Sequence, residues 1–436
     1  MSDTTSADPA GGLTALQGTA LYVGAVLGTG VIALPALAAQ VAGPASLVAW
    51  CALVVLSVPL AATFAALGAR HPDAGGVSTY ARLAFGERTA VVVGWCFFFT
   101  VPMGAAPAAL FGGQYIAAAT GGGNTTTTLA AAAMMALVTA ANAAGLRVTG
   151  RLQLALAAML TLLLLLSVTL ALPHARWTNL TPFAPHGWSA IAPAAALLVW
   201  SFAGWEAITH LAAEFRRPAR DLPRATALAL AVVGVLYLAV AFAVVTVLGA
   251  SAATADAPLG ELMSQGLGGN ARLLAAAAAV LLTLGTMNAY YAGVAKLGAA
   301  LGRDGALPEW LARGSTAGEV PRRSLAVIST LTIPSLIATG VFHARTETLV
   351  SLTAGLIVTV YAVGVAAAVR LLPRRSKGRT AAMVALAAVV ALLAATGVYL
   401  AWAAVVSTAA LLYLRFKPRP IPSPQPEPTA SAVGSQ

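Results

Sequence analysis

The stretch GAVLGTGVIALPA, from Gly24 to Ala36, lies inside a run of 61 residues (9–69) that contains no Asp, Glu, Lys or Arg. The chain of 436 residues is 59% hydrophobic and only 9% charged, whereas soluble domains carry roughly 25% charged residues. So few charges cannot cover the surface of a soluble protein of this length, and the same composition excludes a largely disordered chain. The sequence therefore predicts an all-α polytopic membrane protein.

The gaps between charged residues predict 12 transmembrane helices. A helix needs roughly 20 apolar residues to cross a bilayer, so residues 9–69 hold two helices with a turn at Gly43-Pro44, and the uncharged residues 89–146 hold two more. We expect one helix in each of the windows 152–175, 190–213, 225–255, 273–295, 324–344 and 348–369. The window 380–414 is basic at both ends, which requires an even number of crossings, so we expect two short helices around Gly397.

The positive charges predict the orientation of the chain and account for its net charge of +11. With both termini in the cytoplasm, 22 of the 25 Lys and Arg residues fall in cytoplasmic segments, and only Arg176, Arg272 and Arg345 fall outside. This asymmetry is typical of multi-pass proteins of the cell membrane. The basic residues are thus a topology signal, and they do not predict a nucleic-acid partner.

Two helices are interrupted where they would lie deepest in the bilayer. Gly28-Thr29-Gly30 lies midway along the first predicted helix, and Phe202-Ala203-Gly204 lies midway along the sixth, directly before Trp205 and Glu206. Unwound backbone at membrane depth is tolerated only where it lines a cavity or is buried in protein. Broken helices in corresponding positions of two halves are the best sequence pointer to a transporter's binding site.

The spacing of the two breaks predicts an inverted repeat. The first and sixth helices are five helices apart, and because five is odd, the second copy of a five-helix unit enters the membrane with opposite orientation. We therefore expect a first repeat at 13–172, a second at 173–371, an additional helix pair at 380–416, and disordered tails at 1–12 and 417–436.

Paired helix breaks suit a zwitterionic ligand. The N-terminus of a half-helix presents free N–H groups to an anion such as a carboxylate, and the C-terminus of a half-helix presents carbonyl groups to an ammonium. Because nearly all other predicted helix positions are apolar, we expect an α-amino acid with a small or medium apolar side chain.

Glu206 is the only acidic residue predicted deep in the membrane. Burial favours its protonated form, which suits proton coupling, although a neutral carboxyl that bonds broken-helix backbone is the structural alternative. His210 follows by four residues and could relay a proton or serve structure. Asn288 and Tyr290 are possible cavity residues, with helix packing as the alternative for both. Pro102 is a possible cavity residue because it is expected to kink the third predicted helix and so shape the cavity. We expect no metal site and no cofactor.

Four stretches of the chain resemble the amino acid–polyamine–organocation (APC) transporter superfamily. They are GAVLGTGVIALPA (24–36), HPDAGGVSTYARLAFG (71–86), WSFAGWEAITHLAAEFRRPARDLPRA (200–225) and AKLGAALGRDGALP (295–308). Within the third stretch, the sequence FAGWEAITHLAAEF (202–215) is most similar to bacterial methionine and branched-chain amino acid exporters.

The resemblance implies a five-plus-five inverted-repeat (LeuT-like) fold that works by alternating access. It implies carboxylate binding at Gly28, Thr29 and Gly30, amine binding at Phe202, Ala203 and Gly204, and an aromatic lid formed by Trp200, for which a packing role is the alternative. It also implies a proton-coupling role for Glu206. The predicted fifth helix lacks the Lys that some proton-coupled members carry, which leaves the coupling ion open.

We therefore expect a secondary active transporter of neutral apolar L-amino acids of the methionine, leucine, isoleucine and valine class. Proton-coupled efflux is the preferred version, and a proton- or sodium-coupled importer or exchanger on the same fold is the alternative. The helices contain no HExxH, no GxSxG and no acidic pair, so an enzyme is not expected. A channel would require a continuous polar pore, which helices so rich in Ala and Leu do not offer. We expect a monomer or a homodimer.

Overall fold

The computed structural model describes residues 13–71, 76–145, 150–206, 215–268, 271–313, 320–342 and 344–417. Within these residues the chain is helical, apart from one isolated parallel β-bridge between Leu13 and Phe215. The tail predicted at 1–12, residues 418–436 of the second predicted tail, and His210 lie outside the described residues.

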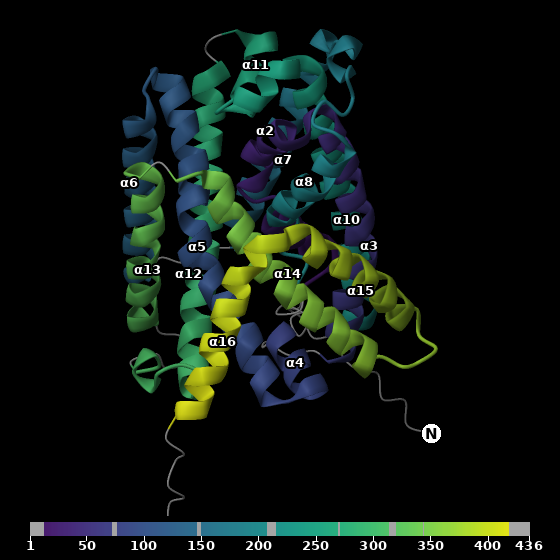
Figure 1. Cartoon of the computed structure of the whole chain (residues 1–436), viewed down its shortest axis with the longest axis vertical. Helices are drawn as coiled ribbons and strands as arrows, with labels where there is room; N and C mark the ends of the chain where they lie inside the picture. The colour runs from purple at the N-terminus through teal and green to yellow at the C-terminus, as the bar shows by residue number, and fades with distance from the viewer. Residues whose placement is uncertain are drawn as a thin grey trace, which may run out of the picture.

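The helices of the first predicted repeat are α1 to α7. Their bounds are α1 Ala15–Val26, α2 Gly30–Ala42, α3 Ser46–Arg70, α4 Val77–Phe85, α5 Glu87–Thr120, α6 Asn124–Ala143 and α7 Gly150–Ala171. The 34-residue α5 is the longest of them and contacts α6, α12 and α14. It runs through the middle of the molecule in Figure 1.

The helices of the remaining chain begin with a short α8, which continues as a 3-10 turn at Val199–Phe202. Their bounds are α8 Ile191–Leu198, α10 Pro218–Ala243, α11 Pro258–Leu267, α12 Ala271–Arg303, α13 Arg322–Gly340, α14 Thr346–Leu371, α15 Lys377–Thr396 and α16 Leu400–Phe416.

Eight helical stretches of the described chain are long and apolar enough to cross a membrane. Two of them contain two helices each: Gly30–Arg70 bends at Gly43, where φ is +59°, and Lys377–Phe416 bends at Gly397, where φ is +55°. Both turns lie where the sequence predicted them. Ala15–Val26, Ala158–His174 and Trp188–Phe202 are shorter apolar helices. The described chain is thus all-helical and polytopic, and the number of 12 crossings stays a prediction.

The two ends of the helix bundle carry different elements. The short helix α11 covers one end, which we call the α11 end, and α4 lies at the opposite end, the α4 end (Figure 1). At the α4 end, Arg82 of α4 contacts Glu87 at 2.8 Å and Asp304 at 3.6 Å. Lys417, just after α16, donates a hydrogen bond to the Gly305 carbonyl at 3.0 Å. Segments distant in the sequence therefore meet at this end.

Candidate functional site

The first predicted break separates α1 from α2. Helix α1 ends at Val26 and α2 begins at Gly30. Between them the Gly28 N–H donates to the carbonyl of Val26 at 2.7 Å, which is not a helical bond. The first N–H groups of α2 have no acceptor within their own helix and concentrate partial positive charge at Gly30. The backbone here is therefore prepared for an anionic ligand group.

The second predicted break follows the 3-10 turn at Val199–Phe202. Ala203 is extended, with φ −68° and ψ 140°, and Gly204 has φ +117°. An L side chain at Gly204 would be strained by this φ, and its Cβ would lie 3.1 Å from the Ala25 carbonyl oxygen. Gly204 thus allows the second break to lie directly against the last turn of α1.

The two breaks also contact each other between Gly30, at the start of α2, and Ser201, in the 3-10 turn. A Cβ on Gly30 would collide with Ser201 Oγ and would lie 3.1 Å from Ser201 Cα. Ser201 is 2% exposed, and among the described residues its hydroxyl has no hydrogen-bond partner. A buried hydroxyl at the N-terminus of α2 can donate to the same anion that the helix N–H groups attract. The sequence did not single out this serine.

Tyrosines of α1, α10 and α14 contact backbone carbonyl groups at the two breaks. The Tyr237 hydroxyl lies 2.7 Å from both the Val26 and the Ser201 carbonyl oxygens. Tyr22 donates to the Trp205 carbonyl at 2.6 Å, and Tyr361 lies 3.0 Å from the Phe202 carbonyl. Unpaired carbonyls at membrane depth are costly, so these hydroxyls stabilise the broken conformation.

Glu206 is held inside the second break and is 6% exposed. Its Oε2 accepts a hydrogen bond from the Gly204 N–H at 3.0 Å and lies 2.6 Å from the Tyr361 hydroxyl. The neutral side chains of Tyr22 and Tyr290 lie near this carboxyl group. The carboxyl group thus touches the backbone that the sequence assigns to the ligand amine.

Trp200 lies between the first break and α5. A Cβ on Gly104 would lie 2.9 Å from Trp200 Cη2, and a Cβ on Gly30 would lie 3.0 Å from Trp200 Cδ1. Phe111 meets the ring edge-on, with 6.5 Å between the ring centroids. The indole therefore packs between the first break and α5, and these contacts fit either a lid or a packing residue.

The three possible cavity residues have different surroundings. Tyr290 is 40% exposed and lies near Glu206. The Pro102 carbonyl instead accepts a hydrogen bond from Ser335 of α13 at 3.0 Å. Asn288 Oδ1 accepts one from Asn142 Nδ2 of α6 at 2.8 Å. Tyr290 therefore joins the Glu206 region, while the polar contacts of Pro102 and Asn288 join helices to one another.

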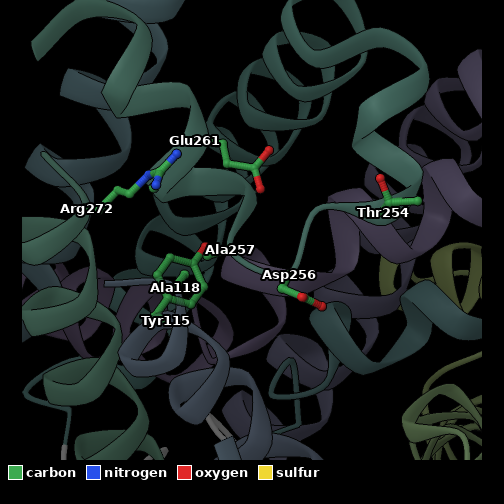
Figure 2. A pocket seen from close by; sticks show the side chains of 8 residues that line it. Tyr115, Ala118, Thr254, Asp256, Ala257, Glu261 and Arg272 are labelled. Atoms are coloured by element: carbon green, nitrogen blue, oxygen red, sulfur yellow. The ribbon is translucent and has the colours of Figure 1, made fainter. Parts of the chain in front are cut away.

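A cavity of about 210 Å³ lies at the α11 end. Figure 2 shows side chains of α5, the turn before α11, α11 itself and the start of α12 around it. It is lined by Tyr115, Ala118, Thr254, Asp256, Ala257, Gly260, Glu261 and Arg272.

One side chain of this cavity connects it to the first break. The Tyr115 hydroxyl donates to the Ile32 carbonyl at 2.7 Å and accepts the Leu259 N–H at 3.1 Å, so it joins α2 to α11. The cavity therefore adjoins the half-helix whose N-terminus is at Gly30. The sequence did not identify Tyr115, because nothing local to α5 indicates contact with two distant elements.

Comparison with known proteins identifies the family of the chain. The sequence profile of the amino acid permease family matches residues 13–430. The uncharacterized amino acid permease YecA of Bacillus subtilis is 33% identical over 405 residues, which cover 93% of this chain and 96% of that protein. The L-methionine/branched-chain amino acid exporter YjeH of Escherichia coli is 34% identical over 231 residues, or 51% of this chain and 53% of that protein.

The branched-chain amino acid permease BcaP of Bacillus subtilis is 24% identical over 246 residues, or 52% of this chain and 53% of that protein. The family match includes both breaks and extends through α16. The chain therefore belongs to the amino acid permease family of the APC superfamily, and it is a multi-pass membrane transporter and not an enzyme.

Proposed function

We propose that this protein exports neutral apolar L-amino acids of the methionine and branched-chain class by proton antiport. The observation that carries the proposal is the contact between the two helix breaks. The N-terminus of α2 and the Ser201 hydroxyl, which has no hydrogen-bond partner among the described residues, offer donors to a carboxylate, while carbonyls of the second break lie beside Glu206. This arrangement matches both charged groups of an α-amino acid.

The surroundings of the breaks favour an apolar ligand side chain. A Cβ on Gly28 would contact Thr286 Cγ2 at 3.5 Å, and Trp200 lies close to Gly30, Gly104 and Phe111. None of these residues carries a charge that would bind a cationic or anionic ligand side chain. The name of YjeH, a methionine and branched-chain exporter, points to the same substrate class.

Proton coupling rests on Glu206. An ionised carboxyl group buried at membrane depth costs free energy, so such groups are usually paired or functional. Glu206 contacts the Gly204 backbone beside the proposed amine site, so a change in its protonation reaches the ligand. Import, or exchange coupled to protons or sodium, is the alternative on the same scaffold.

The proposed transport cycle requires a defined membrane topology. We propose 12 crossings in two inverted five-helix repeats with a C-terminal helix pair, and we place the α4 end and both termini in the cytoplasm of a cell membrane. The support is the 22-to-3 distribution of Lys and Arg and the equivalent position of the breaks in α1/α2 and α8.

Efflux from vesicles tests the proposal. Reconstituted vesicles are loaded with labelled methionine, leucine or lysine, and efflux is recorded with and without an opposing proton gradient. We expect gradient-dependent efflux of methionine and leucine but not of lysine. Sodium-dependent flux would favour the alternative, and the absence of flux for both apolar substrates would overturn the proposal.

The Glu206→Gln variant tests the assignment of the coupling residue. A glutamine keeps an oxygen that can accept the Gly204 N–H but does not titrate, so we expect methionine efflux to lose its pH dependence. If the variant transports with the full pH dependence of the wild type, the coupling group is another residue, of which His210 is the first to examine by a His210→Asn substitution.

A further inference from the structure

Tyr361 faces two hydrogen-bond acceptors with a single hydroxyl proton. Its oxygen lies 2.6 Å from Glu206 Oε2 and 3.0 Å from the Phe202 carbonyl oxygen. A tyrosine hydroxyl donates one hydrogen bond and can accept others, whereas a backbone carbonyl only accepts. The protonation state of Glu206 therefore decides which of the two acceptors receives the Tyr361 proton.

When Glu206 is protonated, its hydroxyl can donate to the Tyr361 oxygen while its Oε2 still accepts the Gly204 N–H. Tyr361 is then free to donate to the Phe202 carbonyl, and all four groups are satisfied. When Glu206 is ionised it can only accept, so Tyr361 turns its proton to the carboxylate. The Phe202 carbonyl then loses its donor.

We propose that Tyr361 makes proton binding and substrate-amine binding mutually exclusive by covering or freeing the Phe202 carbonyl. With Glu206 ionised, the freed carbonyl accepts a hydrogen bond from the ammonium of the amino acid. With Glu206 protonated, Tyr361 occupies that carbonyl and the ammonium loses its acceptor. This inference rests on the proposed function and adds to it a residue from α14, far from both breaks in the sequence.

Mutual exclusion is what distinguishes antiport from symport. A carrier that holds either the proton or the amino acid, and reorients with one of them bound, exchanges the two across the membrane. A simple electrostatic role for Glu206 would not need Tyr361, because the carboxylate charge would attract the ammonium whatever the hydroxyl does. The two explanations therefore make different predictions for Tyr361.

Among the described residues, two further tyrosines lie near Glu206. They are Tyr22 of α1 and Tyr290 of α12, and His210 is in the adjoining segment outside the described residues. Tyr237 also faces two acceptors, but both are carbonyls, of Val26 and Ser201, and neither can take up a proton. Tyr237 is therefore a matched comparison for Tyr361.

The direct test measures methionine affinity at neutral and at mildly acidic pH for purified wild type and Tyr361→Phe. For wild type we expect weaker binding at acidic pH by about tenfold, within the usual range of coupling between two sites. Tyr361→Phe leaves the Phe202 carbonyl permanently free, so its affinity should differ less than about twofold between the two conditions. Tyr237→Phe should keep the wild-type ratio even if its affinity is lower.

The outcomes separate this inference from the function it rests on. A Tyr361→Phe protein that keeps the wild-type pH ratio overturns the role of Tyr361 but leaves the transporter proposal standing. Wild type that does not bind methionine at all overturns the function itself. Tyr291→Phe, which removes a hydroxyl bonded only weakly to Thr332 at 3.4 Å, is expected to behave as wild type.

A measurement on wild type covers the case in which Tyr361→Phe does not fold. The desamino analogue 4-methylthiobutanoate keeps the carboxylate and side chain of methionine but has no ammonium. Because the analogue does not use the Phe202 carbonyl, we expect its binding to be weaker than that of methionine but equal at neutral and mildly acidic pH. If the analogue competes with protons as strongly as methionine does, the inference is overturned.

Discussion

At the scale of single residues, the site depends on backbone atoms that lack helical partners. Gly204 allows the second break to approach Ala25, and Tyr22, Tyr237 and Tyr361 bind the carbonyls that the breaks expose. Glu206 then adds a titratable group to backbone that is already fixed. In the proposed mechanism the ligand is therefore bound by the main chain, and the side chains determine when its groups are available.

Replacement of Gly204 by alanine should destabilise the protein. The φ of +117° is unfavourable for an L side chain, and the new Cβ would lie 3.1 Å from the Ala25 carbonyl oxygen. Strain of this kind costs about 1–3 kcal/mol, so we expect Gly204→Ala to lower the melting temperature in detergent by about 2 °C or more.

Gly293 of α12 provides the matched control, because a Cβ there meets no atom within 4 Å. Alanine is the better helix former by about 0.5–1 kcal/mol, so Gly293→Ala should leave the melting temperature unchanged or raise it. Equal melting temperatures for the two variants would contradict the conformation assigned to Gly204.

At the scale of elements, the sequence predicted the breaks but not what lies against them. Glycines around a small residue, with a proline nearby, weaken a helix locally. In the structure α1 ends at Val26, and α8 continues as a 3-10 turn that ends before Ala203. The turns at Gly43 and Gly397 were predictable for the same local reason.

The partners of the breaks could not be predicted, because they depend on how distant helices are rotated about their axes. Tyr361 is 155 residues from Glu206, and Tyr237 is 211 residues from Val26. A tyrosine in an apolar helix indicates that a hydroxyl needs a partner, but one sequence does not say which. Asn288 shows the same limit, since its partner Asn142 is 146 residues away.

Helix α11 provides a test of electrostatics at the level of an element. Burial raises the pKa of Glu261 above its ordinary value of 4.5; Arg272 opposes this effect and Asp256 adds to it. Compared with the unfolded chain, the folded protein therefore favours the neutral form of Glu261. The free energy of unfolding decreases as the pH rises through the ordinary pKa of a glutamate and above it, because the carboxyl group must then ionise in its buried position. This cost is absent at a pH well below 4.5.

Glu261→Gln should consequently be more heat-stable than wild type at neutral pH, by about 1–2 °C, and equal to it in acid. Glu309, which is exposed at the α4 end, gives the control variant Glu309→Gln, for which we expect no difference at either pH. Thermal unfolding at the two pH values measures both. A Glu261→Gln protein that is less stable at neutral pH would contradict this electrostatic account.

At the scale of the whole molecule, the contacts among Arg82, Asp304, Gly305 and Lys417 bring three predicted cytoplasmic segments to one end. Tyr115 and Leu259 bring α5 and α11 together at the other. If the α4 end faces the cytoplasm, most Lys and Arg residues lie on the cytoplasmic side, as the positive-inside rule requires.

Cysteine labelling in cells tests this orientation. In a background with Cys51→Ser and Cys96→Ser, we expect Thr125→Cys, in the first turn of α6, to react with a membrane-impermeant maleimide in intact cells. Arg375→Cys, between α14 and α15, should react only after permeabilisation. The reverse pattern would place the α4 end outside.

The central claim is that the amino acid and the proton exclude each other at the paired breaks. Its most direct measurement is the pH change of a weakly buffered solution of the purified protein on addition of methionine, at a pH where Glu206 is partly protonated. We predict that binding releases protons, and that Glu206→Gln releases none. Proton uptake on binding, or release undiminished in Glu206→Gln, would contradict the account.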